Sequence, residues 1–281
     1  MVPRSRGWCC RQSLVDGSCI LLATSTSTQH CQGPVPTTPL IADQRPTAKT
    51  PVGPWRWSQH WRDVLFLHWP AAPDWLRERL PAALEIDTFC GQAWVSFVGF
   101  RLEQVQLHGW PRLPLFSSML ELNFRTYVRY RGELAIYFLT MHADHRWLVA
   151  AARCLTPLPY ALTTLSYARC DALLDFHCAP RGEQLPLLTA SAHTSDETDF
   201  AAPDSLDAWL LERYVAYVAD RHERLYRMGV AHEPWRLQRV ELRYCEQHLD
   251  PHALATRDAA PLCHFSRGAS ARLWPFSRAG R

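Results

Sequence analysis

Residues 121–127, with the sequence ELNFRTY, place polar or aromatic side chains at every second position. In an extended strand, alternate side chains point to the same face. One face therefore carries four such side chains, Glu121, Asn123, Arg125 and Tyr127. The opposite face carries Leu122 and Phe124, which we expect to pack in the core. The polar face borders either solvent or a pocket, and its charge alternation alone favours solvent.

Two histidines and an aspartate lie close together at His142, Asp144 and His145. Side chains of these types bind transition metals. In an extended segment, however, His142 and His145 point to opposite faces, so a polar turn after a strand explains them better. The cysteines near the N-terminus lack the paired CxxC spacing of a zinc site. We therefore expect no metal and no cofactor.

The neighbours His177–Cys178 and Cys263–His264 each join a thiol with a base. Adjacent side chains on a strand face opposite ways, so neither pair is a natural nucleophile–base couple, and packing is the better interpretation. The sequence also lacks a glycine-rich phosphate loop, a GxSxG elbow and an HExxH motif.

The elements that must position these residues are mainly strands. Alternating or apolar runs predict strands at 84–89, 93–105, 122–130, 134–139, 166–177, 185–192, 214–219, 224–230 and 272–274, and a strand or helix at 236–247. Proline and capping signals predict short helices at 73–80 and 206–213, and an alanine-rich run predicts a buried helix at 147–154. We predict an α+β fold, an antiparallel sheet rolled into a cone or barrel with a few peripheral helices.

The composition is that of a globular protein, with 281 residues, 47% hydrophobic and 20% charged. The net charge of +3 demands neither a nucleic-acid nor a membrane partner. No stretch reaches the roughly eighteen apolar residues of a membrane helix. The apolar run near the N-terminus is too short for a signal peptide. We therefore expect a cytoplasmic protein.

Residues 1–54 differ from the rest of the chain, because they are rich in Ser, Thr, Pro and Gln and show little periodicity. They predict a disordered leader or an over-long gene start, followed by a single domain at 55–281. Of the 30 basic residues, only Lys49 is a lysine, so the other 29 are arginines. A domain without lysine cannot form a lysine Schiff base.

Several stretches occur in a characteristic order. They are 66–70 (FLHWP), 84–100, 121–129, 152–153 with 158–160, 212–214 with 224–227, 232–235 (HEPW) and 261–274. Together they resemble the YqjF-like family, domain of unknown function 2071, over roughly residues 61–275. That family is similar in fold to acetoacetate decarboxylase, an antiparallel sheet coned around a ligand-holding cavity.

The resemblance also implies what has happened to the decarboxylase site. The arginine and proline of the decarboxylase motif fall on Arg153 and Pro159, whereas its two lysines fall on Tyr160 and Ala161. A tyrosine phenol cannot form an imine with a carbonyl substrate. The catalytic glutamate of the decarboxylase falls near Arg125. The resemblance thus implies a pocket that has lost its nucleophile and gained a cation.

We therefore expect a small-molecule-binding protein, and not a Schiff-base decarboxylase. The expected ligand site consists of Glu121, Asn123, Arg125, Arg153 and Tyr160. Arg125 and Arg153 would fix an anionic or carbonyl compound by bidentate hydrogen bonds, while Asn123 and Tyr160 orient the remainder.

Two alternatives stay open. In the first, the protein is a non-covalent enzyme on a keto or enol substrate, with Tyr160 as general acid and Arg153 lowering the pKa of the phenol. In the second, its role is structural, and an aromatic-rich surface makes homo-oligomer contacts. The twelve tryptophans of the chain motivate this second alternative.

Overall fold

The computed structural model describes residues 53–110, 118–256 and 259–280, all of which belong to one compact unit. The predicted leader, 1–54, and with it Lys49, falls almost wholly outside these ranges. Within them, no helix is long and apolar enough to cross a membrane.

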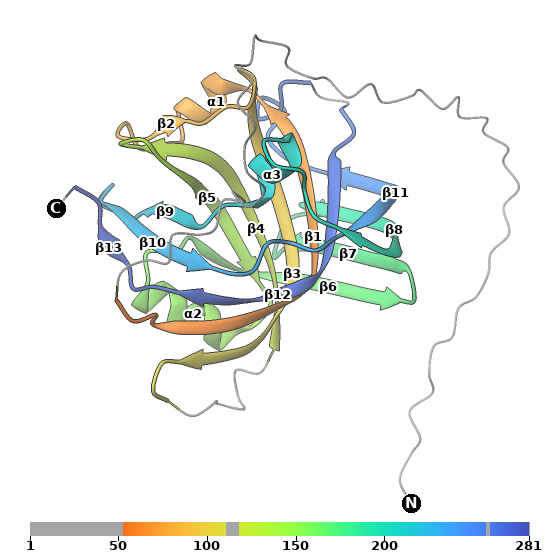
Figure 1. The fold of residues 1–281 in the computed structure, drawn as a ribbon, viewed down its shortest axis with the longest axis horizontal. Helices are drawn as coiled ribbons and strands as arrows, with labels where there is room; N and C mark the ends of the chain where they lie inside the picture. Colours follow the sequence, from red (N-terminus) through yellow and green to blue (C-terminus); the bar gives the residue numbers. More distant parts are fainter. Residues whose placement is uncertain (1–52, 111–117, 257–258, 281) are drawn as a thin grey trace, which may run out of the picture. The chain divides into compact units, whose positions relative to one another are not determined.

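The described residues form a mainly β structure with three helices (Figure 1). The strands are β1 (Trp57–Ala71), β2 (Glu85–Ile86), β3 (Ala93–Leu107), β4 (Ser118–Tyr130), β5 (Glu133–Ala143), β6 (Tyr160–Cys170), β7 (Leu173–Pro180), β8 (Leu188–Asp199), β9 (Val215–Ala219), β10 (Leu225–Ala231), β11 (Leu237–Gln247), β12 (Leu262–Leu273) and β13 (Ser277–Arg278). The helices are α1 (Pro73–Arg77), α2 (Arg146–Leu155) and α3 (Leu206–Leu211).

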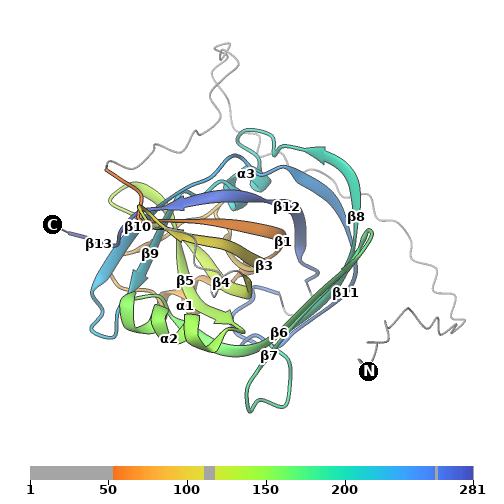
Figure 2. The same ribbon diagram turned by 90° about the horizontal axis from the view of Figure 1, so that it is seen from below.

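All thirteen strands belong to one sheet, in the order β13-β10-β9-β5-β6-β7-β8-β11-β12-β1-β3-β4-β2. Two additional pairings, β10 with β12 and β5 with β4, join strands that are distant in this order. They close a ring of hydrogen-bonded strands that runs β12-β1-β3-β4-β5-β9-β10. We call this the seven-strand ring. Figure 2 shows these strands around a common interior, with α2 on the outside.

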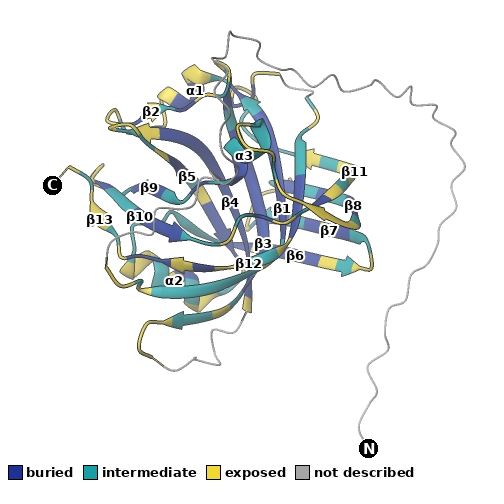
Figure 3. Ribbon diagram, in the orientation of Figure 1, coloured by how far each residue is buried: buried dark blue, intermediate teal, exposed yellow. Residues whose placement is uncertain are grey.

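The hydrophobic core is divided into two clusters that lie on the two faces of β4. Leu122 and Phe124 belong to the first cluster, whereas Tyr127 belongs to the second. Every residue from Met119 to Val128 is buried, and β4 is among the most deeply buried elements in Figure 3. A strand buried on both faces has no solvent face. The expectation from charge alternation that residues 121–127 border solvent is therefore wrong.

Most predicted elements are confirmed, and four of the predicted strands form the hairpins β4–β5 and β9–β10. Arg131 and Gly132 both have positive φ, as a tight hairpin turn requires. The strand predicted at 166–177 is instead two strands that turn at Asp171. Helix α2 occurs as predicted but is mostly exposed, with only Val149 buried.

Two further differences concern the sheet itself. Its pairings are antiparallel except that β5 runs parallel to β6 and to β9. The long strand β1 was not predicted as a strand. Bulges at two points break the pairing of β1 with β3, between Ser58 and His60 and between Arg62 and Leu65.

Candidate functional site

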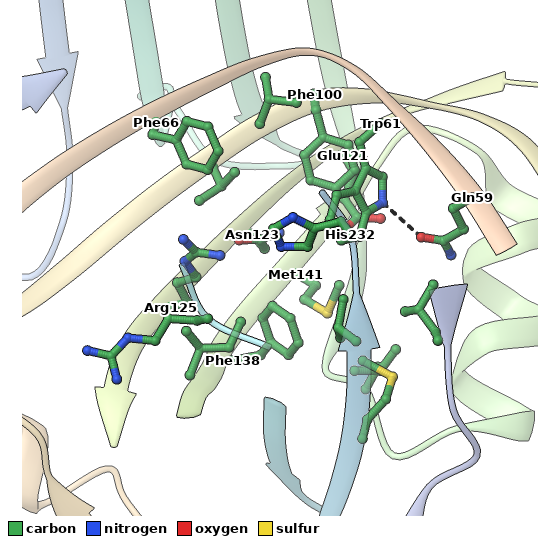
Figure 4. A pocket seen from close by; sticks show the side chains of 18 of the residues that line it. Gln59, Trp61, Phe66, Phe100, Glu121, Asn123, Arg125, Phe138, Met141 and His232 are labelled. Carbon is green, nitrogen blue, oxygen red and sulfur yellow. Dashed lines mark hydrogen bonds between the residues drawn. The ribbon is translucent and has the colours of Figure 1, made fainter. Parts of the chain in front are cut away.

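The seven-strand ring encloses a cavity of about 90 Å³. All seven strands contribute lining side chains, and others come from the start of β6, from the end of α3 and from the segments after α3 and after β10. Figure 4 shows part of this lining. Most of the lining is apolar, including Phe66, Phe100, Phe138 and Met141. The few polar groups in such a cavity act at low dielectric, where charge interactions are strong.

Three side chains of the predicted polar face line this cavity from β4. They are Glu121, Asn123 and Arg125 (Figure 4). The irregularity in the β4–β5 pairing lies on β5, where Leu139 is passed over between the partners of Phe124 and Arg125. The alternation along β4 is therefore unbroken, and its polar face is a pocket wall.

Arg125 is buried and lacks a carboxylate within ion-pair distance among the described residues. Its Nη2 donates a long hydrogen bond of 3.4 Å to the carbonyl of Leu210, and its Nε has no partner. The same carbonyl accepts a bond of 3.0 Å from the hydroxyl of Tyr127. A buried donor without an acceptor costs about 1–3 kcal/mol, so Arg125 favours any acceptor that enters the cavity.

A second arginine, Arg213, lines the cavity just after α3. Its Nη1 is 2.9 Å from Oδ2 of Asp87, and its Nε donates to the carbonyl of Trp209 at 2.7 Å. The other carboxylate oxygen of Asp87 accepts from Arg129 at 3.0 Å. The charge of Arg213 is therefore balanced, although its Nη2 stays buried without a partner.

Glu121 and Tyr160 form a hydrogen-bonded pair in the wall of the cavity. The chain before β6 is fixed by Met141, whose N–H donates to the carbonyl of Pro159 at 3.1 Å. Tyr160 then pairs with Met141 and donates its hydroxyl to Oε2 of Glu121 at 2.8 Å. Burial raises the pKa of Glu121 to about 7, although hydrogen bonds from Tyr160 and Asn123 oppose the rise. This carboxyl group therefore titrates near neutral pH.

The structure brings together four of the five predicted ligand-site residues, Glu121, Asn123, Arg125 and Tyr160. Arg153 is the exception, because it lies exposed in the last turn of α2 and does not line the cavity. Nor is the pKa of Tyr160 lowered. Burial and the neighbouring Glu121 raise it well above the usual value.

No pattern in the sequence marks Arg213 or Asp87 as site residues. Neither residue belongs to a spacing pattern within its segment. The two are 126 residues apart in the sequence, so their ion pair cannot be predicted from it. Arg213 fell within a stretch that carried the family resemblance, but nothing indicated that it faces the cavity.

The cluster at 142–145 is a turn only in part, because His142 still belongs to β5, and Asp144 and His145 alone form the bend between β5 and α2. His142 bonds to Thr163 at 2.9 Å, whereas His145 precedes α2 and accepts from the N–H of Leu148 at 3.3 Å. Asp144 accepts from the N–H of Leu120 at 2.9 Å. Among the described residues, no group of three or more His, Cys, Asp or Glu side chains could hold a metal ion.

The Cys–His neighbours have separate surroundings. Cys178 packs in the first core cluster, and His177 bonds to Thr189 at 2.9 Å. His264 is also buried, and its Nε2 lies 3.0 Å from Oδ1 of Asp207, which packing alone did not predict.

Comparisons with known proteins identify the family. The family model for DUF2071, an uncharacterized conserved protein, matches residues 58–270. The chain belongs to this family. The "Uncharacterized protein YqjF" of Bacillus subtilis (strain 168) is 34% identical over 236 residues, which cover 84% of this chain and 97% of YqjF.

Several solved structures share the fold of this DUF2071 chain, although their sequence identity to it is low. The enduracididine biosynthesis enzyme MppR complexed with pyruvate is 16% identical, with a TM-score of 0.59 over 81% of this chain and 91% of MppR. Acetoacetate decarboxylase from Legionella pneumophila is 14% identical, with a TM-score of 0.59 over 86% of this chain and 98% of the decarboxylase. The predicted likeness to the decarboxylase fold is thus confirmed.

We predict that Asp87→Asn destabilises the protein by about 3–5 kcal/mol, because it leaves Arg213 buried without a counter-charge. Urea unfolding measures the loss. Arg129→Ala is the matched control, since Arg129 is 46% exposed and its loss leaves the Asp87–Arg213 pair intact. We expect this control to lose about 1 kcal/mol or less. Equal losses in the two variants would contradict a dominant role for the buried pair.

Glu121 should make stability fall as pH rises. Between its ordinary pKa of 4.5 and about 7, the folded protein keeps the proton that the unfolded chain releases. Across this window, Glu121 therefore removes up to about 3 kcal/mol of stability. We expect Glu121→Gln to flatten this part of the stability–pH curve, measured by urea unfolding at successive pH values. The control Glu241→Gln removes an exposed carboxylate of β11 and should leave the curve parallel to that of the parent protein.

Proposed function

We propose that this protein binds a small carboxylate-bearing compound in the cavity of the seven-strand ring, with Arg125 as the anchor. The observation that carries the proposal is the buried guanidinium of Arg125, which has an unpartnered Nε–H and no carboxylate neighbour among the described residues. A carboxylate would supply both the missing charge and the missing acceptor.

The charges around the cavity support a monoanion. Arg213 is neutralised by Asp87, and the raised pKa of Glu121 keeps that group partly protonated at neutral pH. Arg125 thus supplies the surplus positive charge. The unpartnered Nη2 of Arg213 and Oδ1 of Asn123 are further hydrogen-bonding groups for the ligand.

The size of the cavity supports a compact ligand. An apolar cavity of about 150 Å³ accepts benzene, so a space of about 90 Å³ suits a smaller molecule. MppR, which shares the fold, has been solved in complex with pyruvate, a compound in this size range. Because residues 53–281 contain no lysine, the proposed binding involves no imine.

Isothermal titration with short-chain carboxylates, each paired with its neutral amide, tests this proposal. We expect carboxylates to bind and amides not to bind. Loss of a charge-assisted hydrogen bond in Arg125→Ala should weaken binding roughly ten- to a hundredfold. Arg125→Lys keeps the positive charge but loses the planar guanidinium. Its affinity for carboxylates should therefore lie between that of the parent protein and that of Arg125→Ala. The exposed Arg221→Ala is the control, and binding that survives Arg125→Ala at full affinity would reject the site.

A second candidate function is acid–base catalysis on a bound keto acid. It is favoured by the hydrogen-bonded Glu121–Tyr160 pair, because a carboxyl group with a pKa of about 7 exchanges protons readily at neutral pH. Glu121, not Tyr160, would take the proton from the carbon beside the carbonyl of the keto acid. The Tyr160 hydroxyl, which donates to Glu121, would position the Glu121 carboxylate. Arg153 would take no part, since it lies outside the cavity.

NMR in D2O tests this candidate by following exchange of the protons beside the carbonyl of an added keto acid. We expect Glu121→Gln to reduce the exchange rate to background and Tyr160→Phe to reduce it at least roughly tenfold, within the usual range for acid–base groups. Arg153→Ala should exchange at the parent rate. Exchange that persists in Glu121→Gln would eliminate the candidate.

A further inference from the structure

An open groove adjoins the buried cavity on the outer side of the ring. Side chains from β1, β3 and β12 and from the segment after β10 line it, among them Ser58, Gln104 and Arg272. Two residues, Gln59 and His232, line both the groove and the cavity. The two spaces are therefore separated by little more than side chains at this point.

The separation lies beside one of the two junctions of the seven-strand ring that have only two backbone pairs, the other being β5 with β9. Strand β10 pairs with β12 only at Val230 with Leu273 and at Ala231 with Arg272. His232 follows directly, and the chain leaves the sheet there. From this point, backbone hydrogen bonds between β10 and β12 no longer close the wall of the ring.

Aromatic rings fill the wall instead. The ring of His232 lies 4.8 Å from that of Trp235, 4.9 Å from that of Tyr214 and 5.7 Å from that of Trp61. Trp61 also stacks on Trp235 at 5.9 Å and donates its Nε1–H to the side chain of Gln59 at 2.9 Å. Figure 4 shows Gln59, Trp61 and His232 together at one side of the cavity.

The strand that carries Trp61 is irregular on both sides of it. Bulges interrupt the β1–β3 pairing before His60 and after Arg62, and Asp63 has a positive φ of 50°. Opposite, a Cβ on Gly268 would lie 2.0 Å from the carbonyl of Trp61, so only glycine allows β12 to approach here. Bulges of this kind re-aim side chains, and here they direct Gln59 and Trp61 to the boundary between groove and cavity.

The His232 ring is held weakly compared with the backbone pairs around it. Among the described residues, the ring makes one hydrogen bond, 2.7 Å from Nδ1 to the carbonyl of Glu233, and ring contacts. Burial lowers the pKa of His232 to about 4, so the ring is neutral at ordinary pH and has no ion pair to break. A rotation of this side chain breaks few interactions and leaves the strands in place.

We propose that Trp61 and His232 form a gate between the groove and the cavity, and that small molecules reach Arg125 by passing these two rings. The gate admits compact molecules and excludes bulky ones. The gate is inferred from the position of the cavity beside the groove. It does not depend on which ligand the cavity binds.

A cysteine placed inside the cavity reports on the gate without any ligand. Met141→Cys puts a thiol in the lining, and Met228→Cys does so from β10 if the first variant folds poorly. The protein is treated with methyl methanethiosulfonate or with a bulky aromatic analogue, and peptide mass spectrometry follows the labelling rate of each cysteine. The native Cys178, which is fully buried in the first core cluster, is labelled only when the protein unfolds and so serves as an internal reference.

In the Met141→Cys background, Trp61→Ala and His232→Ala should each accelerate labelling of the new cysteine by roughly tenfold or more, because each substitution removes three ring contacts. Both substitutions should also lower the ratio of the labelling rate with the small reagent to that with the bulky reagent. Trp147→Ala, which removes an exposed tryptophan of α2, should change neither quantity.

Three results would overturn the gate. The first is an unchanged labelling rate in both gate variants. The second is equal acceleration at Cys178, which would indicate general unfolding. The third is rapid labelling by the bulky reagent with the gate intact. None of these depends on carboxylate binding, so the gate and the proposed function can fail separately.

Discussion

The buried ion pair between Asp87 and Arg213 is the interaction on which the arrangement of the site depends. It joins the end of β2 to the segment that follows α3, and Arg129 connects the same carboxylate to β4. Without Asp87, a guanidinium that is almost fully buried would have no counter-charge, a state that proteins avoid. The ion pair therefore fixes the end of α3 against the ring, and with it the Leu210 carbonyl that holds Arg125 and Tyr127.

The same ion pair makes the two cavity arginines chemically unequal. Arg213 is already compensated and acts mainly as part of the wall, whereas Arg125 has no carboxylate neighbour in the described chain. Glu121 does not compensate Arg125 fully, because burial shifts its titration to neutral pH. The cavity is thus an apolar container with one uncompensated cation, and this asymmetry supports recognition of a single negative group.

The sequence predicted those parts of the site that depend on local periodicity. The alternation along 121–127 located Glu121, Asn123 and Arg125 on one face, because strand geometry alone decides which side chains share a face. It could not decide what covers that face, since the answer depends on the closing of the ring by distant strands. The family resemblance located Tyr160, but not the orientation of Arg153, because that orientation depends on which face of α2 packs against the sheet, and Val149 is the residue that the helix buries. Asp87, His232 and Trp61 meet their partners only in the folded chain, so no spacing pattern reveals them.

The contacts made at the end of α3 constrain the number of residues in this segment. Its last turn presents the Leu210 carbonyl to Arg125 and Tyr127, and Arg213 must then reach Asp87 two residues beyond the helix. One inserted or deleted residue would rotate the following positions by about 100° around the helix axis and carry both contacts away from the cavity. A substitution on the outer face of α3 therefore leaves both contacts in place, whereas a change in the number of residues between Ser205 and Arg213 does not.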